Sequence, residues 1–220
     1  MSEASVSEVA TPTVHLWLAS LQADAMETRR ILSVLSAEER ARAARYRVDR
    51  LGEQFVLARA ALRLGLARVL GVEPRRLQFA AHSTGKPYLA WPASSVEFST
   101  ARSDELAVGV CTSARRIGID LERVVARPDL DEVARTRFTA AEVVALHAQP
   151  PLARTHAFYR VWTRKEAVLK ALGVGLAAPL DAMPVEGVGL RVEPVCVAPG
   201  HEAALAVEAS NWHLRTTRLW

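Results

Sequence analysis

Two carboxylates lie close together in the segment Ile117–Glu122, which reads Ile-Gly-Ile-Asp-Leu-Glu. In a β-strand, alternate side chains point to opposite faces, so Asp120 and Glu122 would share one face with Gly118, which leaves room beside them. Like charges at this spacing repel each other unless a cation or a base lies between them. Oxygen ligands in this arrangement suit Mg²⁺, which typically takes one or two carboxylates together with substrate phosphates. An edge strand with a solvated acidic face would produce the same pattern.

A third carboxylate lies in a predicted helix that runs from Phe158 to Leu172. The segment consists of good helix formers, has no internal Pro or Gly, and is followed by Gly173 as a stop signal. Glu166 and Lys170 are one turn apart on the flank of its apolar face. By itself this is an amphipathic core helix with one ion pair, which contributes about a few tenths of a kcal/mol. The apolar face consists of Phe158, Val161, Trp162, Val168, Leu169 and Leu172.

Lysine is rare in this chain. Only three of its 28 Lys and Arg residues are lysines, namely Lys86, Lys165 and Lys170. A general bias towards Arg suggests that Lys is kept where a compact ammonium that can lose its proton is needed. Lys165 falls within the apolar face of the predicted helix, where its stem would follow the apolar surface and carry the charge to the rim.

These residues together indicate metal-assisted chemistry on a pyrophosphate. Asp120, Glu122 and Glu166 would hold the metal ion. Lys86 and Lys170, with several arginines, would neutralise the phosphates. Kinases, nucleotidyl transferases and pyrophosphatases could all use such a set. The chain has no Gly-rich phosphate loop of the Walker or dinucleotide type, which counts against the commonest nucleotide-binding classes.

The composition is that of a soluble globular protein, with 220 residues of which 50% are hydrophobic and 24% charged. We find no signal peptide and no apolar run of the roughly 20 residues that a membrane span needs, so we expect a cytoplasmic protein without membrane contact. Cys111 and Cys196 lie in apolar surroundings and are expected to be buried thiols. The net charge of +4 and the pI of about 9.5 favour acidic partners. Because the arginines are spread along the chain, we do not expect nucleic acid to be the partner.

Helices and strands alternate in two rounds along the chain. Residues 1–13 are expected to form a flexible leader, followed by a strand at Val14–Leu18. A capping box at Ser36–Glu39 begins one helix, and a second helix runs from Gly52 to Leu70. The arginines of these helices are expected to lie on solvated faces. They are Arg40, Arg42, Arg45, Arg47, Arg59 and Arg63.

After Pro74 the pattern is typical of strands. A turn at His82–Pro87 places Lys86 beside a forced bend. We expect Thr100–Asp104 to be a hairpin connection. A second capping box, at Thr139–Glu142, begins the helices of the second half, and residues 188–207 are again rich in strand formers. The predicted strands between these points are Leu77–Phe79, Ser95–Ser99, Glu105–Cys111 and Ile117–Glu122.

The order of elements predicts an α+β fold built from two similar halves that meet near Ser113–Arg116. The predicted divisions are a leader at 1–13, an N-terminal half at 14–114 and a C-terminal half at 115–220. Two similar halves within one chain favour a monomer.

The two motifs together resemble the signature pair of the Sfp-type 4′-phosphopantetheinyl transferases. Gly118–Glu122 matches the pattern G-(I/V)-D-x-E, and Trp162–Gly173 matches W-(S/T)-x-K-E-(A/S)-x-x-K-x-x-G at every fixed position. The Gly85–Pro87 turn, the Phe138–Glu142 segment and the Arg-rich helix are also similar to the family. The resemblance covers roughly residues 36–181, and the chain length suits the family's pseudo-dimeric class. It therefore implies a pseudo-two-fold arrangement with the active site at the junction of the halves.

The resemblance implies a Mg²⁺-dependent reaction, in which Mn²⁺ is an alternative metal. The phosphopantetheine arm of coenzyme A would pass to a serine of an apo acyl or peptidyl carrier protein, with release of 3′,5′-ADP. Asp120, Glu122 and Glu166 would hold the metal. Glu166 and Lys170 would be the catalytic residues: Glu166 would activate the serine, and Lys170 would bind the phosphate that carries the pantetheine arm.

The resemblance also assigns the rest of the substrates. Lys86 would bind coenzyme A near its adenosine end, and Arg40, with Arg42 as a second candidate, would lie near the 3′-phosphate. Recognition of the acidic carrier is implied at about Arg123–Phe138. Glu142 resembles a family acid near the metal, although its capping box explains it equally well.

One motif departs from the family pattern. Members usually carry a Ser-His pair in F-N-(I/L)-S-H-(S/T), whereas this chain reads Phe-Ser-Thr-Ala-Arg-Ser over Phe98–Ser103. Ala101 replaces the serine and Arg102 the histidine. Arg102 can bind phosphate at least as well as histidine, but it cannot carry a proton. This leaves an alternative in which the protein binds coenzyme A and carrier proteins with weak or no transferase activity.

Overall fold

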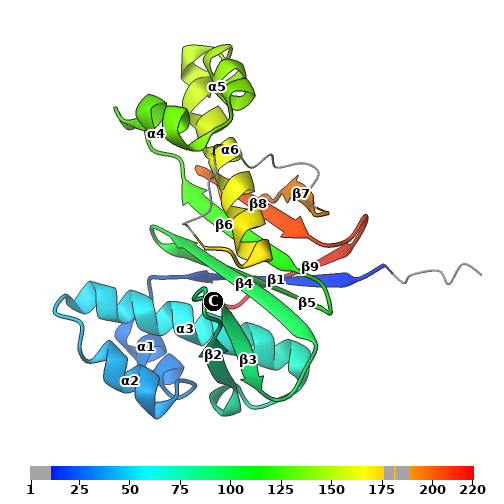
Figure 1. The fold of residues 1–220 in the computed structure, drawn as a ribbon. Coiled ribbons are helices and arrows are strands. Elements are labelled where there is room, and N and C mark those ends of the chain that lie inside the picture. Colours follow the sequence, from blue (N-terminus) through cyan, green and yellow to red (C-terminus); the bar gives the residue numbers. More distant parts are fainter. Residues whose placement is uncertain (1–10, 176–180, 182–188) are drawn as a thin grey trace, which may run out of the picture.

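The chain forms three β-sheets and six α-helices over residues 11–175, 181 and 189–220, which are the residues that the computed structural model describes. A four-stranded sheet lies at the centre, with three helices and a β-hairpin on one side (Figure 1). A three-stranded sheet and a long helix lie on the other side. The fold class is therefore α+β, as the sequence predicts. Within the described residues, no helix is both long enough and apolar enough to cross a membrane.

The central sheet has the strand order β4-β5-β1-β9. β1 pairs antiparallel with β5 and parallel with β9, so the last strand of the chain joins a sheet of the predicted N-terminal half. Val14, Leu16 and Leu18 of β1 pack towards the three-stranded sheet, whereas Trp17 and Ala19 face the helices. This alternation gives the sheet two apolar faces, so both are covered. The strands are β1 (Thr13–Ser20), β4 (Val96–Ser103), β5 (Leu106–Ser113) and β9 (His213–Arg218).

Helix α3 (Asp49–Leu70) covers one face of the central sheet and ends at Gly71. Gly71 has φ = 67°, the left-handed conformation that glycine adopts readily at a helix end. Two shorter helices, α1 (Ala25–Leu32) and α2 (Ala37–Ala43), precede it. A 3₁₀ turn at Pro74–Arg76 then leads into the hairpin of β2 (Gln78–Ala81) and β3 (Pro87–Trp91).

The three-stranded sheet has the order β6-β8-β7. Its outer strand β6 lies next to β4 of the central sheet, where the Ile119 N–H donates to Ser99 Oγ at 3.2 Å and the Arg123 N–H donates to Ser103 Oγ at 2.9 Å. Two side chains of β4 therefore join the sheets at the junction of the predicted halves. The strands are β6 (Ile117–Arg123), β7 (Arg191–Pro194) and β8 (His201–Val207).

Helix α6 (Pro151–Leu172) crosses the outer face of this second sheet and corresponds to the predicted helix, with earlier turns added. It contacts β6 at Gly118, where a Cβ atom would lie 2.0 Å from the Ala167 carbonyl oxygen and 2.5 Å from the Ala171 nitrogen. The interpretation that Gly118 leaves room beside the carboxylates is therefore wrong, because the helix backbone fills that room. The glycine brings α6 onto β6.

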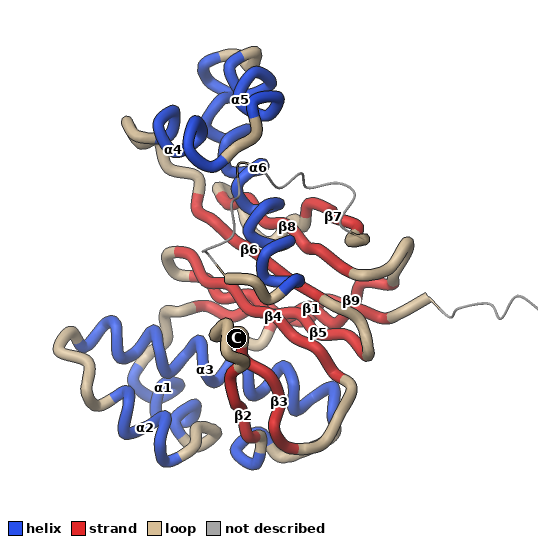
Figure 2. Tube along the Cα trace, viewed as in Figure 1, coloured by secondary structure: helices blue, strands red, loops and turns tan. Residues whose placement is uncertain are grey.

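A separate lobe is formed by α4 (Leu130–Arg137), α5 (Ala140–His147) and the first turns of α6 (Figure 2). Its small core contains Phe138, Leu146 and Phe158. The predicted capping box begins α5, with the Thr139 N–H donating to Glu142 Oε2 at 2.7 Å.

Several sequence predictions are confirmed and others are wrong. Both capping boxes are present, and β1 contains the predicted strand Val14–Leu18. β4 and β5 form the predicted hairpin, but its connection is shorter than Thr100–Asp104, since β4 continues to Ser103 and the chain turns at Asp104. Cys111 is buried but Cys196 is exposed, and both thiols are free.

Two predicted segments begin or end differently from the described structure. Thr13 already belongs to β1, and residues 1–10 lie outside the described residues. The same holds for residue 188, at the start of the predicted strand-rich tail. The helix α1 and the strands β3 and β9 were not predicted from the sequence.

Candidate active site

The three predicted carboxylates are brought to one place by β6 and α6. Ile117, Ile119 and Leu121 are buried in the core between the sheets, so Asp120 and Glu122 point to the opposite face of β6, under α6. Glu166 comes from the helix surface that packs on this face. Asp120 is 5% exposed and Glu166 is 7% exposed, which excludes a solvated acidic face.

The pKa of each carboxyl lies above its ordinary value. For Asp120 the main cause is burial, which the nearby charge of Lys170 only partly offsets. For Glu122 and for Glu166, burial is again the largest cause, and the negative charge of Asp120 is the second. The three groups are therefore coupled, and each makes ionisation of the others less favourable.

Two side chains donate hydrogen bonds to the three carboxylates of this acid cluster. Lys170 Nζ is 2.7 Å from Asp120 Oδ1 and 3.4 Å from the Thr100 carbonyl oxygen, so it links α6 to both β6 and β4. The Ser103 hydroxyl donates to Glu122 Oε2 at 3.1 Å. Ser103 was not among the predicted site residues, and only its place in the altered Phe98–Ser103 motif could have drawn attention to it.

The donor set of the cluster fits a divalent cation. Asp120 Oδ2 and Glu166 Oε1 are buried, and neither accepts a hydrogen bond from the described residues. Carboxylate oxygens are the ligands that Mg²⁺ and Mn²⁺ prefer. Within the described part of the chain, no three Asp, Glu, His or Cys side chains already converge as a complete metal site. The ammonium of Lys170 instead lies against Asp120, with 2.7 Å between Nζ and Oδ1.

The acid cluster lies between two cavities. The first, of about 490 Å³, is lined by Asp120, Glu122 and Lys170 at one end and by residues of α2, α3 and β4 elsewhere. The second, of about 320 Å³, is lined by Glu166 and Lys170 together with Lys86. Because Lys170 and Thr100 line both, one elongated ligand could pass the acid cluster and occupy the two cavities.

Lys86 is held at the C-terminal end of α6. Its ammonium donates to the Ala171 carbonyl oxygen at 3.3 Å and lies 3.8 Å from Glu97 Oε2. Burial lowers the pKa of Lys86, and the charge of Arg116 lowers it further, while Glu97 opposes the shift. The predicted turn thus brings this lysine to the second cavity.

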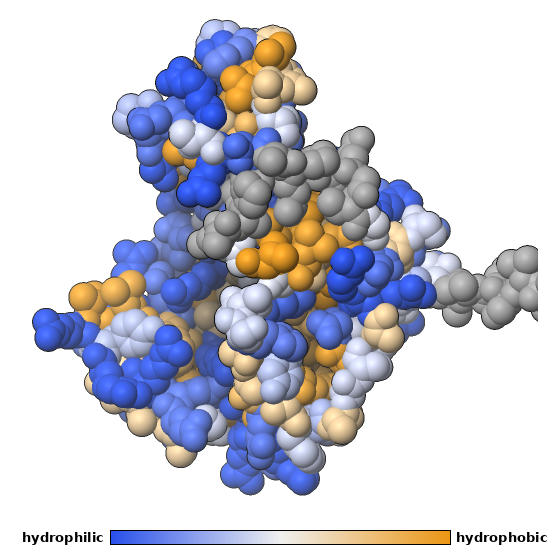
Figure 3. Space-filling model, viewed as in Figure 1, coloured by the Kyte–Doolittle hydropathy of each residue, from blue (hydrophilic) through white to orange (hydrophobic). Residues whose placement is uncertain are grey.

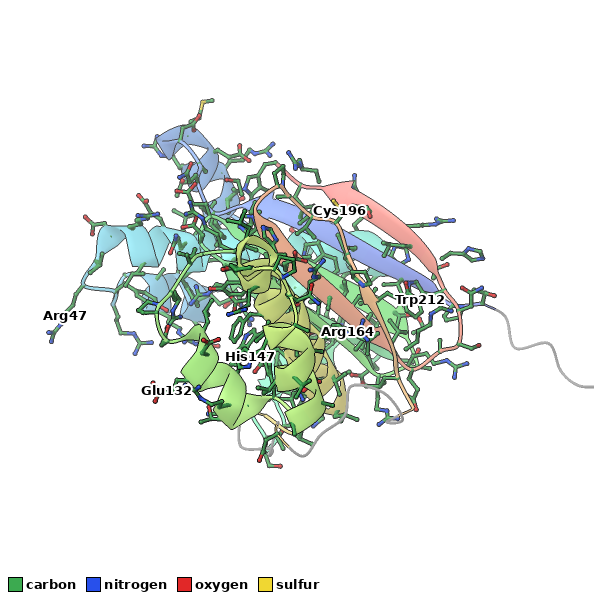
Figure 4. All side chains as sticks on the ribbon, turned by 90° about the horizontal axis from the view of Figure 1, so that it is seen from above. Arg47, Glu132, His147, Arg164, Cys196 and Trp212 are labelled. Carbon is green, nitrogen blue, oxygen red and sulfur yellow. The ribbon has the colours of Figure 1, made fainter. Side chains whose placement is uncertain are left out.

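The predicted arginines fall in different places. Arg102 on β4 and Arg42 on α2 line the first cavity. Arg40 lines neither cavity of the acid cluster, and its Nη1 donates to the Leu35 carbonyl oxygen at 2.6 Å. Arg47 lies beyond the end of α2 and points into solvent at the tip of the connection to α3 (Figure 4). Of the two candidates for the 3′-phosphate, Arg42 is therefore the one at the cavity.

The expectation of a solvated face is wrong for Arg63. This side chain is buried on α3 and donates from Nε to Glu39 Oε2 at 2.6 Å. Arg59, one turn earlier, also pairs with Glu39 and lines the first cavity. No sequence spacing indicates this network, because Glu39 lies on α2 and the two arginines lie on α3.

The prediction that Lys165 carries its charge to the rim of α6 is wrong. Its side chain is 2% exposed, and its ammonium lies 2.9 Å from Glu142 Oε2. Glu142 also completes the capping box of α5, so this ion pair fixes α5 to α6 directly beside Glu166. A structural role accounts for Glu142, and the resemblance to a metal-site acid is not needed to explain it.

The segment Arg123–Phe138, where the resemblance implies carrier recognition, leads into the projecting lobe. Figure 3 shows apolar surface on this lobe, and its exposed residues include Val144 at 70% and Leu152 at 96%. In the view of Figure 4, Glu132 of α4 lies at the outer edge of the lobe and His147 of α5 lies among its helices. The lobe therefore offers a surface on which a protein partner could rest beside the acid cluster.

Comparison with known proteins gives a consistent result. Residues 116–205 match the model of the 4′-phosphopantetheinyl transferase superfamily. The chain is 32% identical over 217 residues to the 4′-phosphopantetheinyl transferase HetI of Nostoc sp. (strain PCC 7120), covering 91% of this chain and 92% of the relative. It is 30% identical over 160 residues to a 4′-phosphopantetheinyl transferase of Bacillus subtilis, covering 72% of this chain and 69% of that protein. It is 27% identical over 159 residues to the 4′-phosphopantetheinyl transferase Sfp of Bacillus subtilis (strain 168), with the same coverage of 72% and 69%.

Proposed function

Since the chain belongs to the 4′-phosphopantetheinyl transferase superfamily, we propose that it transfers the 4′-phosphopantetheine arm of coenzyme A to a serine of an apo acyl or peptidyl carrier protein. The products are the loaded carrier and 3′,5′-ADP. The observation that supports this best is the buried acid cluster of Asp120, Glu122 and Glu166, which lies with Lys170 between two adjoining cavities. A pyrophosphate placed there would meet both carboxylates that can hold a cation and the ammonium of Lys170, which lies 2.7 Å from Asp120 Oδ1.

In the proposed reaction, the serine Oγ of the carrier attacks the phosphorus that bears the pantetheine arm. The bond between this phosphorus and the bridging oxygen of the pyrophosphate breaks, and 3′,5′-ADP leaves with the electron pair. Glu166 takes the serine proton, for which its unpartnered Oε1 and its raised pKa are suited. Lys170 donates to the transferred phosphate and neutralises charge that develops on it.

We assign Asp120, Glu122 and Glu166 as the residues that hold a divalent cation, Mg²⁺ or Mn²⁺. When bound, the cation neutralises the pyrophosphate and favours departure of 3′,5′-ADP. Ser103 orients Glu122 by its hydrogen bond, and Gly118 keeps α6 close enough for Glu166 to face Asp120. This explains why the two motifs are needed together.

Binding of the remaining parts of the substrates is divided between the two predicted halves of the chain. Residues 14–114 supply groups that bind coenzyme A, Arg42 and Arg102 in the first cavity and Lys86 in the second, while residues 115–220 supply the metal and catalytic groups. The carrier docks on Arg123–Phe138, where the basic character of the chain suits an acidic partner. We expect one chain to be sufficient, so that the protein acts as a monomer.

The test is a transfer assay with the purified chain, coenzyme A, Mg²⁺ and a panel of apo carriers, read by mass spectrometry. We expect the mass of one phosphopantetheine to be added to at least one carrier by the native protein and none by a Glu166→Gln variant. Replacing Mg²⁺ with Mn²⁺ after removal of metal by EDTA tests the metal preference. Coenzyme A binding without transfer to any carrier would overturn the proposal and favour a binding module, for which the Ala101–Arg102 replacement would be the reason.

A further inference from the structure

A further cavity lies outside the active site, between the C-terminal turns of α3 and the strands β1 and β9. Its volume is about 340 Å³, at the small end of the range of about 300–1,000 Å³ that is usual for ligand pockets. Strand register explains its position, because His15 pairs with Arg215 and Trp17 pairs with Thr217 in the parallel ladder of β1 and β9. Side chains of paired residues share one face of a sheet, so all four point to the side on which α3 lies.

The charge on the walls of this cavity is positive, and the protein does not balance it. Arg68 of α3 and Arg215 of β9 line the cavity, whereas none of its described lining residues is an aspartate or a glutamate. Neither guanidinium forms an ion pair or a hydrogen bond with a side chain in the described part of the chain. The buried arginines of the same helix, by contrast, both pair with Glu39. Two guanidiniums with unused donors at one cavity suit the oxygens of an anion.

His15 adds a neutral polar group to the same cavity. Burial lowers the pKa of His15, and the charge of Arg215 lowers it further, so the imidazole is mostly uncharged at neutral pH. A neutral imidazole has one donor and one acceptor nitrogen, and it can therefore bond to an acid without adding charge. The positive charge of the cavity comes from the two arginines.

The floor of the cavity is apolar. Trp17 is only 3% exposed, and Val69 and Leu219 pack against the same buried cluster. A small inorganic anion would meet the arginines but would leave these apolar side chains in contact with water. An organic anion with a compact apolar body would cover them, which favours binding in proportion to the apolar area removed from water. The lining therefore favours an amphiphilic ligand.

Trp17 separates this cavity from the active site. Its indole lines both this cavity and the first cavity of the active site. A Cβ atom on Gly65 would lie 2.3 Å from the indole Cδ2, and one on Gly109 would lie 2.3 Å from Cε2, so α3 and β5 both touch the ring. An indole confined in this way is a fixed wall. The two cavities are therefore separate sites, with different arginines.

We propose that the cavity between α3 and β9 is a second ligand site, which binds a small amphiphilic carboxylate. Arg68 and Arg215 bind the carboxylate group, whose roughly four acceptor positions match the paired donors of two guanidiniums. The apolar part of the ligand lies against Trp17, Val69 and Leu219. The site takes no part in the proposed transfer reaction, so it does not depend on that function.

The first test is calorimetric titration of the full chain with octanoate, at neutral pH and below the concentration at which octanoate forms micelles. We expect saturable binding to the native protein. Arg68→Gln and Arg215→Gln should each weaken it at least about tenfold, the effect of losing a charge-assisted hydrogen bond. The matched control is Arg218→Gln, since Arg218 is an exposed arginine of β9 that does not line the cavity. It should leave the affinity for octanoate unchanged.

The second test separates the charge of the ligand from its apolar body. Octanol has the chain without the charge, and acetate has the charge without the chain, so each should bind at least about tenfold more weakly than octanoate. Inorganic phosphate should also bind more weakly, because it has no apolar part. Octanol that binds as tightly as octanoate would show that the arginines contribute nothing, and acetate or phosphate that does so would show the same of the apolar floor. Either result would overturn the proposal.

The third test places the ligand in this cavity by two further variants. Val69→Phe keeps both arginines but reduces the space, and it should weaken octanoate binding even if the arginine variants fold poorly. Arg42→Gln changes only the first cavity of the active site and should leave octanoate binding unchanged. The proposal would be overturned by a native protein that does not bind octanoate, by an effect of Arg218→Gln as large as that of Arg215→Gln, or by loss of binding in Arg42→Gln. None of these measurements uses coenzyme A or a carrier, so they stand whether or not the proposed function is correct.

Discussion

Two clusters of buried charge lie at different borders of the same cavity, and they are built in opposite ways. In the arginine cluster, the single carboxylate of Glu39 accepts from Arg59, from Arg63 and from the Ser36 N–H. In the acid cluster, Asp120, Glu122 and Glu166 have one ammonium beside them, that of Lys170, which pairs with Asp120 at 2.7 Å. Glu122 accepts a hydrogen bond from the neutral Ser103 hydroxyl. The first has more donors than its carboxylate needs, and the second has too few.

The pKa values express this difference. Burial alone would raise the pKa of Glu39, but the hydrogen bonds from Arg63, from the Ser36 backbone and from Arg59 together bring it below its ordinary value. The carboxyls of the acid cluster keep raised pKa values despite Lys170. A lowered carboxyl pKa means that the folded state stabilises the ionised form. A raised pKa means that the folded state destabilises the ionised form.

The comparison shows which carboxylates the fold itself compensates. The arginine cluster joins α2, α3 and the 3₁₀ turn and stabilises the fold. The acid cluster leaves two buried oxygens without partners among the described residues, so the fold alone does not explain it. Removing a carboxylate should therefore lower the free energy of unfolding in the arginine cluster and raise it in the acid cluster.

The largest expected effect is on transfer in the Glu166→Gln variant. We expect the rate to fall about 10³-fold, since a general base typically contributes about 10²–10⁴-fold. Without metal, the same variant should be more stable than the native protein by about 1 kcal/mol, because a charge that the fold does not compensate is removed. Transfer kinetics and urea unfolding in EDTA measure the two effects. A variant that loses stability would show that the Glu166 carboxylate is already compensated.

Glu39→Ala should have the opposite signature. It leaves Arg63 buried without its carboxylate and also removes the capping box of α2, so we expect the free energy of unfolding to fall by about 3–5 kcal/mol. Urea unfolding measures this loss, with Glu38→Ala on the exposed side of the same helix as the control. A loss as small as that of the control would mean that the arginine cluster does not stabilise the fold.

Gly118→Ala tests how the acid cluster is assembled. A Cβ atom would lie 2.0 Å from the Ala167 carbonyl oxygen, so α6 must move away from β6 and carry Glu166 and Lys170 with it. We expect a loss of about 2–3 kcal/mol in stability, as for overpacking of a core, and a loss of transfer. Ala134→Gly, on the separate lobe, is a control for a change of similar size at a buried site. Full activity in Gly118→Ala would mean that close contact of α6 and β6 is not required.

The same comparison shows what could be predicted from the sequence. The alternation of Ile117–Glu122 and the helical spacing of Glu166 and Lys170 are local patterns, and the structure brings these residues together at one place. The arginine cluster joins residues 20 and 24 positions apart through side chains, and no local pattern encodes such pairs. For that reason Arg63 was expected in solvent and Glu39 was seen only as part of a cap.

Other features of the fold could not be predicted from the sequence for similar reasons. β9 is exposed along much of its length and pairs with β1 at the opposite end of the chain, so neither its composition nor its neighbours in sequence reveal the partner. Lys165 was expected at the rim because a lysine in an apolar stripe usually extends outward. Its partner Glu142 lies on another helix and could not be identified from spacing alone.

A divalent cation should distinguish the clusters by a smaller effect. Mg²⁺ that binds the acid cluster stabilises the folded state by about 2–3 kcal/mol at about a hundred times its dissociation constant. The melting temperature of the native protein should therefore rise with Mg²⁺, and that of Glu166→Gln should rise much less. Glu39→Gln should keep the full response, because the arginine cluster has no vacant oxygen for the metal. An equal response in all three proteins would place the cation elsewhere.

The smallest expected effect is on the pH dependence of stability, and it isolates Glu39. The pKa of Glu39 is lower in the folded protein than its ordinary value of 4.5, so ionised Glu39 stabilises the folded state above that pH. As pH falls through the lowered pKa, both states become protonated and this contribution is lost.

The difference in free energy of unfolding between the native protein and Glu39→Gln should thus be constant above about pH 6 and shrink by about 1 kcal/mol or more on acidification. The acid cluster is common to both proteins, so its titration cancels in the difference. Urea unfolding of both proteins across the pH range measures this gap, and a gap that widens in acid would contradict the view that the arginine cluster stabilises a carboxylate.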